Sequence, residues 1–202
     1  MNILKKVRST TRPWHDRMEE VALSSKIGDG TLSLHEYKSI ILGHYVFHQS
    51  AEEMLLQSGT LHNVESLSVD ERMKSQSLAN DIDQLGIRPY TFAYRPRISV
   101  DTVPQALGVM YVMEGATLGG TVIGKALQDN PDIANSGAMD YYGCYGSLTG
   151  SRWKQFKEIV VREICTENDQ SIFIEAAEST FKEYAACMEQ AIHILQTEAD
   201  NA

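Results

Sequence analysis

The sequence has few of the residues that build covalent or thiolate-based sites. It contains three cysteines among 202 residues, Cys144, Cys165 and Cys187, and no Cys-x-x-Cys spacing. An odd number of scattered cysteines argues against a disulfide framework and against a thiolate zinc site. We interpret the three thiols as small apolar groups of the core.

Long hydrophobic runs are also lacking. No uninterrupted apolar run is long enough to cross a bilayer, and the basic segment Met1 to Arg8 is not followed by the apolar core of a signal peptide. The sequence therefore predicts a cytoplasmic protein without a membrane segment. A net charge of −9 argues against nucleic-acid binding, because phosphate backbones attract basic surfaces.

Several catalytic motifs are absent as well. There is no Gly-x-Ser-x-Gly elbow, no phosphate loop, no dinucleotide fingerprint and no pair of Glu-x-x-His motifs for a di-iron site. The nearest approach to a metal pair is His44 and His48, which are four residues apart on one helix face among apolar neighbours. We interpret them as buried, hydrogen-bonded imidazoles, with metal binding as the alternative.

What the sequence does contain is helical periodicity over most of its length, without convincing strand alternation or internal repeats. A chain of this length with 43% hydrophobic residues fits one all-α domain covering residues 1–202. Ser33 with Glu36 predicts a capping box, and Ser68 is expected to cap a later helix. Helices are expected over residues 2–24 (with a kink or fresh start at Pro13), 34–56, 69–85, 104–127, 151–166 and 170–197, with a loop over 87–96 and an irregular segment over 133–149.

The most unusual stretch runs from Gly108 to Gly124, which has helical spacing yet carries five glycines. Each glycine in a helix interior costs on the order of 0.5–1 kcal/mol relative to alanine, so their concentration calls for a use of the missing side chains. A neighbouring helix can pack closely on the bare backbone, or a flat ligand can lie against it. Taken alone, the stretch favours helix packing.

His15 lies on the apolar stripe of the first expected helix, within a basic cluster that ends at Arg17. A lone histidine there can be a satisfied core residue. A neutral imidazole opposite a glycine-rich helix, with cations nearby, is however what a haem requires: one axial nitrogen, a thin distal wall and counter-charges for two propionates. The basic cluster consists of Lys5, Lys6, Arg8, Arg12 and Arg17.

At this point the sequence resembles haem oxygenases of the bacterial, biliverdin-producing type. Three motifs carry the resemblance: Thr-Thr-Arg-Pro-Trp-His-Asp-Arg-Met-Glu from Thr10, Glu-Arg-Met-Lys-Ser-Gln-Ser-Leu-Ala-Asn-Asp-Ile-Asp-Gln-Leu-Gly from Glu71, and Tyr-Val-Met-Glu-Gly-Ala-Thr-Leu-Gly-Gly from Tyr111. The similarity covers nearly the whole chain and continues through Tyr145-Gly146, Trp153 with Phe156, and Thr180-Phe181.

The resemblance implies an α-helical fold with haem held between a proximal helix and a kinked, glycine-rich distal helix. His15 matches the axial ligand of the haem iron. Gly115, Gly119 and Gly120 match the catalytic distal backbone that approaches the porphyrin.

Further haem-binding residues follow from the same resemblance. Arg8 falls where the family places a basic propionate partner, Lys154 is a second candidate, and Glu19 lies close to the proximal side. Two positions depart from the pattern: Ala116 stands where mammalian relatives have a distal aspartate, and Glu158 lies near where some relatives have a propionate-binding arginine.

The implied activity is cleavage of haem, as cofactor and substrate, by O2 and external electrons to biliverdin, CO and iron through a ferric-hydroperoxo intermediate on histidine-ligated iron. Ferredoxin, flavodoxin or a reductase is the expected electron donor. Ala116 keeps open a haem sensor or carrier without oxygenase activity, and a fold relative such as a thiamine-salvage-type hydrolase is a third alternative.

Overall fold

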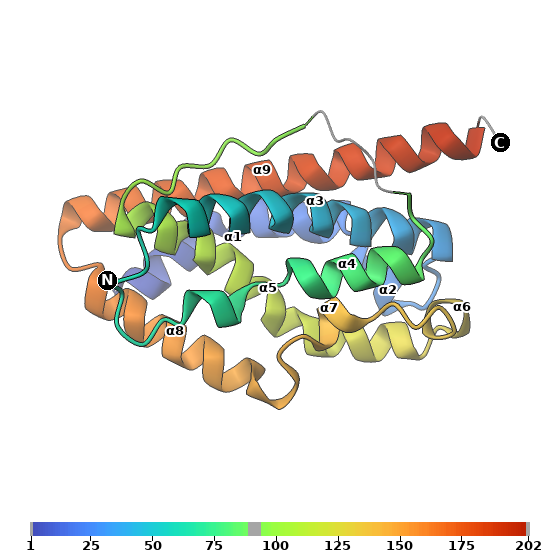
Figure 1. Cartoon of the computed structure of the whole chain (residues 1–202), viewed down its shortest axis with the longest axis horizontal. Coiled ribbons are helices and arrows are strands. Elements are labelled where there is room, and N and C mark those ends of the chain that lie inside the picture. Colours follow the sequence, from blue (N-terminus) through green and yellow to red (C-terminus); the bar gives the residue numbers. More distant parts are fainter. Residues whose placement is uncertain (1, 89–93, 201–202) are drawn as a thin grey trace.

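The computed structural model describes residues 2–88 and 94–200, and all secondary structure in these ranges is helical (Figure 1). The predicted all-α class is thereby confirmed. The elements are α1 (Ile3–Val21), α2 (Ser24–Gly28), α3 (Leu34–Ser58), η1 (Val69–Arg72), α4 (Ser75–Gln84), α5 (Val103–Gln128), α6 (Pro131–Ala134), α7 (Asp140–Gly143), η2 (Gly146–Leu148), α8 (Thr149–Glu163) and α9 (Glu167–Asp200).

The long helix α9 organises the bundle, because α1, α3 and α5 all pack along it. Two glycines permit this close packing. A Cβ atom on Gly43 of α3 would lie 2.9 Å from the Met188 Cα atom, and one on Gly108 of α5 would lie 2.6 Å from the Phe173 carbonyl oxygen. Both distances are too short for a side chain, so glycine is required where these helices meet α9.

Helix α1 runs without a break through Pro13, so the fresh start expected at that residue is wrong. Proline removes one backbone donor, but its ring is exposed and the helix continues. The helix ends at Val21 rather than at Ser24, because Leu23 adopts a left-handed conformation with φ of 53°.

The capping box of Ser33 and Glu36 is confirmed at the start of α3. The helix expected over 69–85 is wrong, because the chain forms η1 and α4 with an extended residue, Met73, between them. Ser68 makes no side-chain cap. The carboxylate of Glu52 on α3 instead accepts the backbone N–H groups of Lys74 and Ser75, at 2.7 and 3.0 Å, and so caps α4 from a neighbouring helix.

The later elements agree with the sequence more closely. Thr102 and Gln105 form a capping box at the start of α5, and α8 and α9 begin within three residues of their predicted starts. The segment 133–149 includes the end of α6 and the whole of the short elements α7 and η2. The loop predicted over 87–96 lies partly outside the described residues.

Helix α5 is long and apolar enough to cross a membrane by length and composition alone, with a mean hydropathy of 1.4 over 18 residues. Half of that window is buried inside the protein, as in a core helix. In Figure 1 the ribbon of α5 changes direction between its green first half and its yellow second half.

Candidate functional site

Helices α1 and α5 lie on the same central helix without packing closely on each other, within the described parts of both. The side of α5 left open carries Gly115, Leu118, Gly119 and Val122, at the i, i+3, i+4, i+7 spacing of a single helix face. Leu118 is 40% exposed and Val122 is 74% exposed. They are two of the four large hydrophobic residues exposed in the described chain. An exposed apolar strip of this kind is typical of a ligand-binding wall.

The glycines of α5 divide into two groups by what surrounds them. A Cβ atom on Gly115 would meet only the edge of Trp153, at 3.9 Å, and one on Gly119 would meet only Ile123 of the same helix, at 3.6 Å. Gly120 and Gly124, in contrast, lie against Tyr142, at 3.4 and 3.3 Å. Gly115 and Gly119 therefore keep a surface thin, whereas Gly120 lets the segment containing α7 approach.

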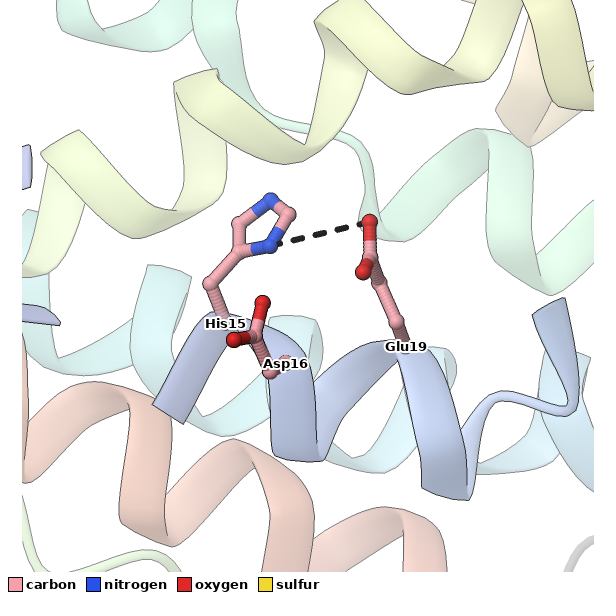
Figure 2. Close-up of side chains that lie close together, drawn as sticks. All are labelled: His15, Asp16 and Glu19. Carbon is pink, nitrogen blue, oxygen red and sulfur yellow. Dashed lines mark ion pairs between the residues drawn. The ribbon is translucent and has the colours of Figure 1, made fainter. Parts of the chain in front are cut away.

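His15 lies on α1 and points toward α5, as Figure 2 shows. Its side chain is 52% exposed, and its ring meets Phe181 of α9 edge-on at a centroid distance of 6.2 Å. The Nδ1 atom lies 3.7 Å from the Glu19 carboxylate, and Nε2 has no hydrogen-bond partner among the described residues. A carboxylate beside Nδ1 orients the ring and leaves Nε2 as the nitrogen available to a metal.

Asp16 completes a group of three potential metal ligands with His15 and Glu19, whose ligand atoms lie within 4.8 Å of one another. All three residues are exposed. The Asp16 carboxylate is already paired with the Arg12 guanidinium at 2.7 Å. We therefore regard His15 as the functional member of the group.

The basic cluster of the first helix is partly neutralised. Arg12 pairs with Asp16, and Arg17 pairs with Glu20 and Glu189. Lys5, Lys6 and Arg8 are exposed and form no ion pair with any described residue. These three cations are available to an anionic ligand.

Arg8 lies near α5. Burial raises the pKa of Tyr111 on that helix, and the charge of Arg8 opposes the rise. Lys154 is exposed on α8, one residue after Trp153, whose ring packs against Tyr111 with centroids 5.7 Å apart. The structure thus brings Arg8 to the first half of α5 and places Lys154 beside the residue that borders Gly115.

A buried ionic cluster beside the glycine face was not expected from the sequence. Glu114 is 1% exposed and accepts hydrogen bonds from Lys74 Nζ at 2.8 Å and from the Tyr145 hydroxyl at 2.6 Å, and it also pairs with Arg72. Burial alone raises the pKa of the Glu114 carboxyl, but the Lys74 charge and these hydrogen bonds bring it below its usual value. The signal in the sequence was a single glutamate within an otherwise apolar helical run.

The two histidines of α3 are buried and hydrogen-bonded, as predicted. His44 Nδ1 lies 2.5 Å from the Tyr184 hydroxyl, and burial lowers the pKa of His44 to about 3. His48 Nδ1 lies 3.1 Å from the Glu52 carboxylate, and its Nε2 lies 3.4 Å from the Tyr141 hydroxyl. Neither residue belongs to a potential metal cluster among the described residues.

A family model described as "Heme oxygenase" matches residues 1–190 of the chain. The chain belongs to the haem oxygenase family. A curated relative named "Heme oxygenase" from Xanthomonas campestris is 24% identical over 163 residues, covering 80% of this chain and 94% of the relative. This membership makes the protein an enzyme of haem degradation and argues against the hydrolase alternative.

Solved haem oxygenases show the same fold. The NO- and CO-bound enzyme from Neisseria meningitidis has a TM-score of 0.72 at 18% identity, covering 96% of this chain and 93% of that one. The Leptospira interrogans enzyme has a TM-score of 0.72 at 15% identity, covering 94% and 100%. Haem oxygenase-1 of Synechocystis, in complex with haem, has a TM-score of 0.69 at 14% identity, covering 99% and 96%.

The arrangement of this chain's own residues suits a haem. Within the described parts of the chain, an imidazole nitrogen without a hydrogen-bond partner, a glycine and aliphatic wall on the facing helix, and cations outside any ion pair match an iron, a flat apolar ring and two propionates. His15, Gly115 and Gly119 are the residues that would lie closest to the ring.

Proposed function

We propose that this protein cleaves haem with O2 and external electrons to biliverdin, CO and iron, using His15 as the axial ligand. The observation that carries the proposal is the exposed His15 imidazole pointing toward the open Gly115–Val122 face of α5. Bound haem would supply the iron that activates O2.

His15 would hold the haem iron through Nε2, while the Glu19 carboxylate, 3.7 Å from Nδ1, favours the tautomer that carries its proton on Nδ1. A thiolate ligand donates electron density to the iron and so favours cleavage of the O–O bond. A histidine ligand donates less. His15 therefore favours reaction at the porphyrin ring. Phe181 supports the imidazole from α9, so that its orientation does not depend on Glu19 alone.

The open face of α5 binds the other side of the ring. Leu118 and Val122 exchange contact with water for contact with the porphyrin, which contributes about 25 cal/mol for each Å² of apolar surface buried. Gly115 and Gly119 bring the helix backbone close to the ring, which restricts where an iron-bound ligand can point.

Ala116 leaves the distal face without a carboxylate at the position that mammalian relatives use. The nearest carboxylate of the same helix turn belongs to Glu114, which is buried and bonded to Lys74 and Tyr145. We infer that backbone carbonyls and ordered water at the glycine wall orient the distal proton donors.

Arg8 and Lys154 are the proposed partners of the propionates. Arg8 is exposed near Tyr111, and Lys154 is exposed beside Trp153, so both lie near the first half of α5. Glu158, also exposed on α8, repels a propionate and so disfavours one orientation of the ring.

A cytoplasmic location and an electron donor such as a ferredoxin, flavodoxin or reductase complete the proposal. The unpaired cations Lys5, Lys6 and Arg8 offer an acidic donor a positive contact on an otherwise acidic protein.

The test is haem titration of His15→Ala followed by aerobic incubation with a reductant. We expect the wild type to lose its Soret band and to release a bile pigment, and His15→Ala to bind haem with an altered Soret band and to lose turnover. His35→Ala is the matched control, because His35 is also an exposed histidine but lies at the start of α3. An unchanged Soret band and undiminished turnover in His15→Ala would overturn the axial assignment, and a wild type that keeps its haem intact would indicate the carrier.

A further inference from the structure

The glycine section of α5 is held by very little side-chain packing. A Cβ atom on Gly115 would meet only the edge of Trp153, one on Gly119 would meet no described residue outside its own helix, and Leu118 and Val122 are exposed. On the opposite face the section packs against Tyr142 at Gly120, where α5 contributes no side chain. A further interaction that resists rotation of this section about the helix axis would keep the wall facing its ligand.

Glu114 is placed to provide that interaction. It directly precedes Gly115 and lies one helical turn before Leu118, at the point where α5 passes from its buried part to its open face. Its backbone carbonyl accepts a second, local hydrogen bond from the Thr117 hydroxyl at 2.6 Å. A hydroxyl bonded back to the preceding turn in this way favours bending of the helix.

The partners of Glu114 come from elements outside α5. Arg72 ends η1, Lys74 precedes α4, and Tyr145 precedes η2. Arg72 is anchored in turn by the Leu67 carbonyl at 2.7 Å and by the Gln155 side chain of α8 at 2.8 Å. Contacts with three partners from different elements fix the position of the Glu114 carboxylate, whereas a single ion pair would leave it free to move.

The cluster is also balanced in charge. Arg72 and Lys74 are cationic, Glu114 is one anion, and Glu52, bound to the Lys74 backbone N–H, is the other. All four residues are buried, with Lys74 at 0% exposure. Glu114 alone pairs directly with the Arg72 and Lys74 side chains among the described residues, so removal of its charge leaves both buried cations without their ion-pair partner, and these side chains must then move apart.

We propose that Glu114 is a positioning residue, whose attachment to Arg72, Lys74 and Tyr145 sets the rotation of α5 and so the position of the Gly115–Gly119 wall against the haem. The inference rests on the proposed function. It assigns to Glu114 no contact with the haem, because the side chain is enclosed by protein.

The test compares wild type with Glu114→Gln, which keeps the shape of the side chain and removes its charge. In the haem-free protein, we expect amide hydrogen exchange of residues 115–120 to accelerate by about tenfold, because buried cations without their partner loosen the local structure. In the ferrous CO complex, we expect the infrared C–O stretching band to shift or split, because the proposed site would place the Gly115–Gly119 wall on the side of the haem where CO binds. Haem is still bound, since His15 is intact.

Glu52→Gln is the matched control. It removes the other buried anion of the same cluster, but Glu52 caps α4 and does not touch α5. This variant lowers thermal stability and leaves both α5 readouts unchanged. Tyr145→Phe, which removes one hydrogen bond from Glu114, gives smaller changes in the same direction and carries the test if Glu114→Gln fails to fold.

The outcomes separate the two proposals. A wild type that binds no haem refutes the proposed function, and the exchange measurement on haem-free protein still decides the role of Glu114. Normal haem binding with unchanged exchange and an unchanged CO band in Glu114→Gln overturns the positioning role. Equal effects of Glu52→Gln and Glu114→Gln on residues 115–120 also overturn it, because they indicate general loosening.

Discussion

Alanine at two glycines of α5 should change the stability of the haem-free protein in opposite directions. A Cβ atom on Gly119 meets only Ile123 Cδ1, at an ordinary contact distance of 3.6 Å. Gly119→Ala should therefore raise the free energy of unfolding by about 0.5–1 kcal/mol, from the helix propensity of alanine. For a chain of this size, the midpoint of thermal unfolding should rise by about 1–4 °C.

Gly108→Ala should do the reverse. Its Cβ atom would lie 2.6 Å from the Phe173 carbonyl oxygen and 2.7 Å from the Ala176 Cβ atom, so α5 and α9 must separate. Overpacking of this kind costs about 1–3 kcal/mol, from which the same propensity gain is subtracted. The net loss of about 1–2 kcal/mol lowers the midpoint by about 2–8 °C.

A larger side chain at Gly119, although tolerated by the haem-free protein, should be unfavourable for haem binding. A leucine there projects into the space between α1 and α5, and we expect Gly119→Leu to weaken haem binding at least about tenfold, which corresponds to 1.4 kcal/mol. Gln128→Leu adds the same side chain at an exposed position nine residues further along α5 and should leave haem affinity unchanged.

Circular dichroism melting of the haem-free variants and Soret titration measure these effects. If Gly119→Ala lowered the melting midpoint as Gly108→Ala does, Gly119 would be a packing residue. If Gly119→Leu bound haem like the wild type, the open face would not be the haem wall.

Three further predictions concern charge and pH. Arg8→Glu should weaken haem affinity or change the biliverdin isomer seen by chromatography, and Lys154→Glu should do so less, because the charge of Arg8 acts on the pKa of Tyr111 on α5, whereas Lys154 is a sequence neighbour of Trp153. Burial raises the pKa of Asp81 to about 6, above its unfolded value, so this residue's stabilising contribution is present near pH 4 and is lost as the pH rises through 6. Urea unfolding of Asp81→Asn should lack that component of the pH dependence. Burial lowers the pKa of His44 to about 3, so its contribution to the free energy of unfolding is present above pH 6.5 and is lost on acidification below that value. His44→Phe should therefore lose less stability than the wild type between pH 6.5 and 4.

The sequence predicts most of the helices because their amphipathic period and caps are local properties. The capping box of Ser33 and Glu36 is an example, since both partners lie within one turn. The break between η1 and α4 depends on Arg72 and Lys74 reaching a glutamate forty residues away, and α4 is capped by Glu52 of another helix. No local pattern contains that information.

The residues of the candidate site remain predictions, and the sequence identifies some of them more readily than others. His15 and the glycines stand out by residue type and spacing, and the structure places His15 toward α5. The separation of Gly119, which faces open space, from Gly120, which lies on Tyr142, depends on where α7 packs. Glu114 was missed because one acidic residue in an apolar helix carries no sign of its partners.

The glycines of α5 show why residue spacing alone left two uses open. Gly108, Gly115 and Gly119 are separated by seven and four residues, so they form one stripe on a helix. A straight helix beside a straight partner would pack this whole stripe against that partner. Here the stripe begins in close contact with α9 at Gly108 and ends in the open at Gly119, so the two helices diverge along it. Helix packing at Gly108 and the proposed haem contact at Gly119 are therefore successive uses of one stripe, and His15 points toward the part of α5 that is left open.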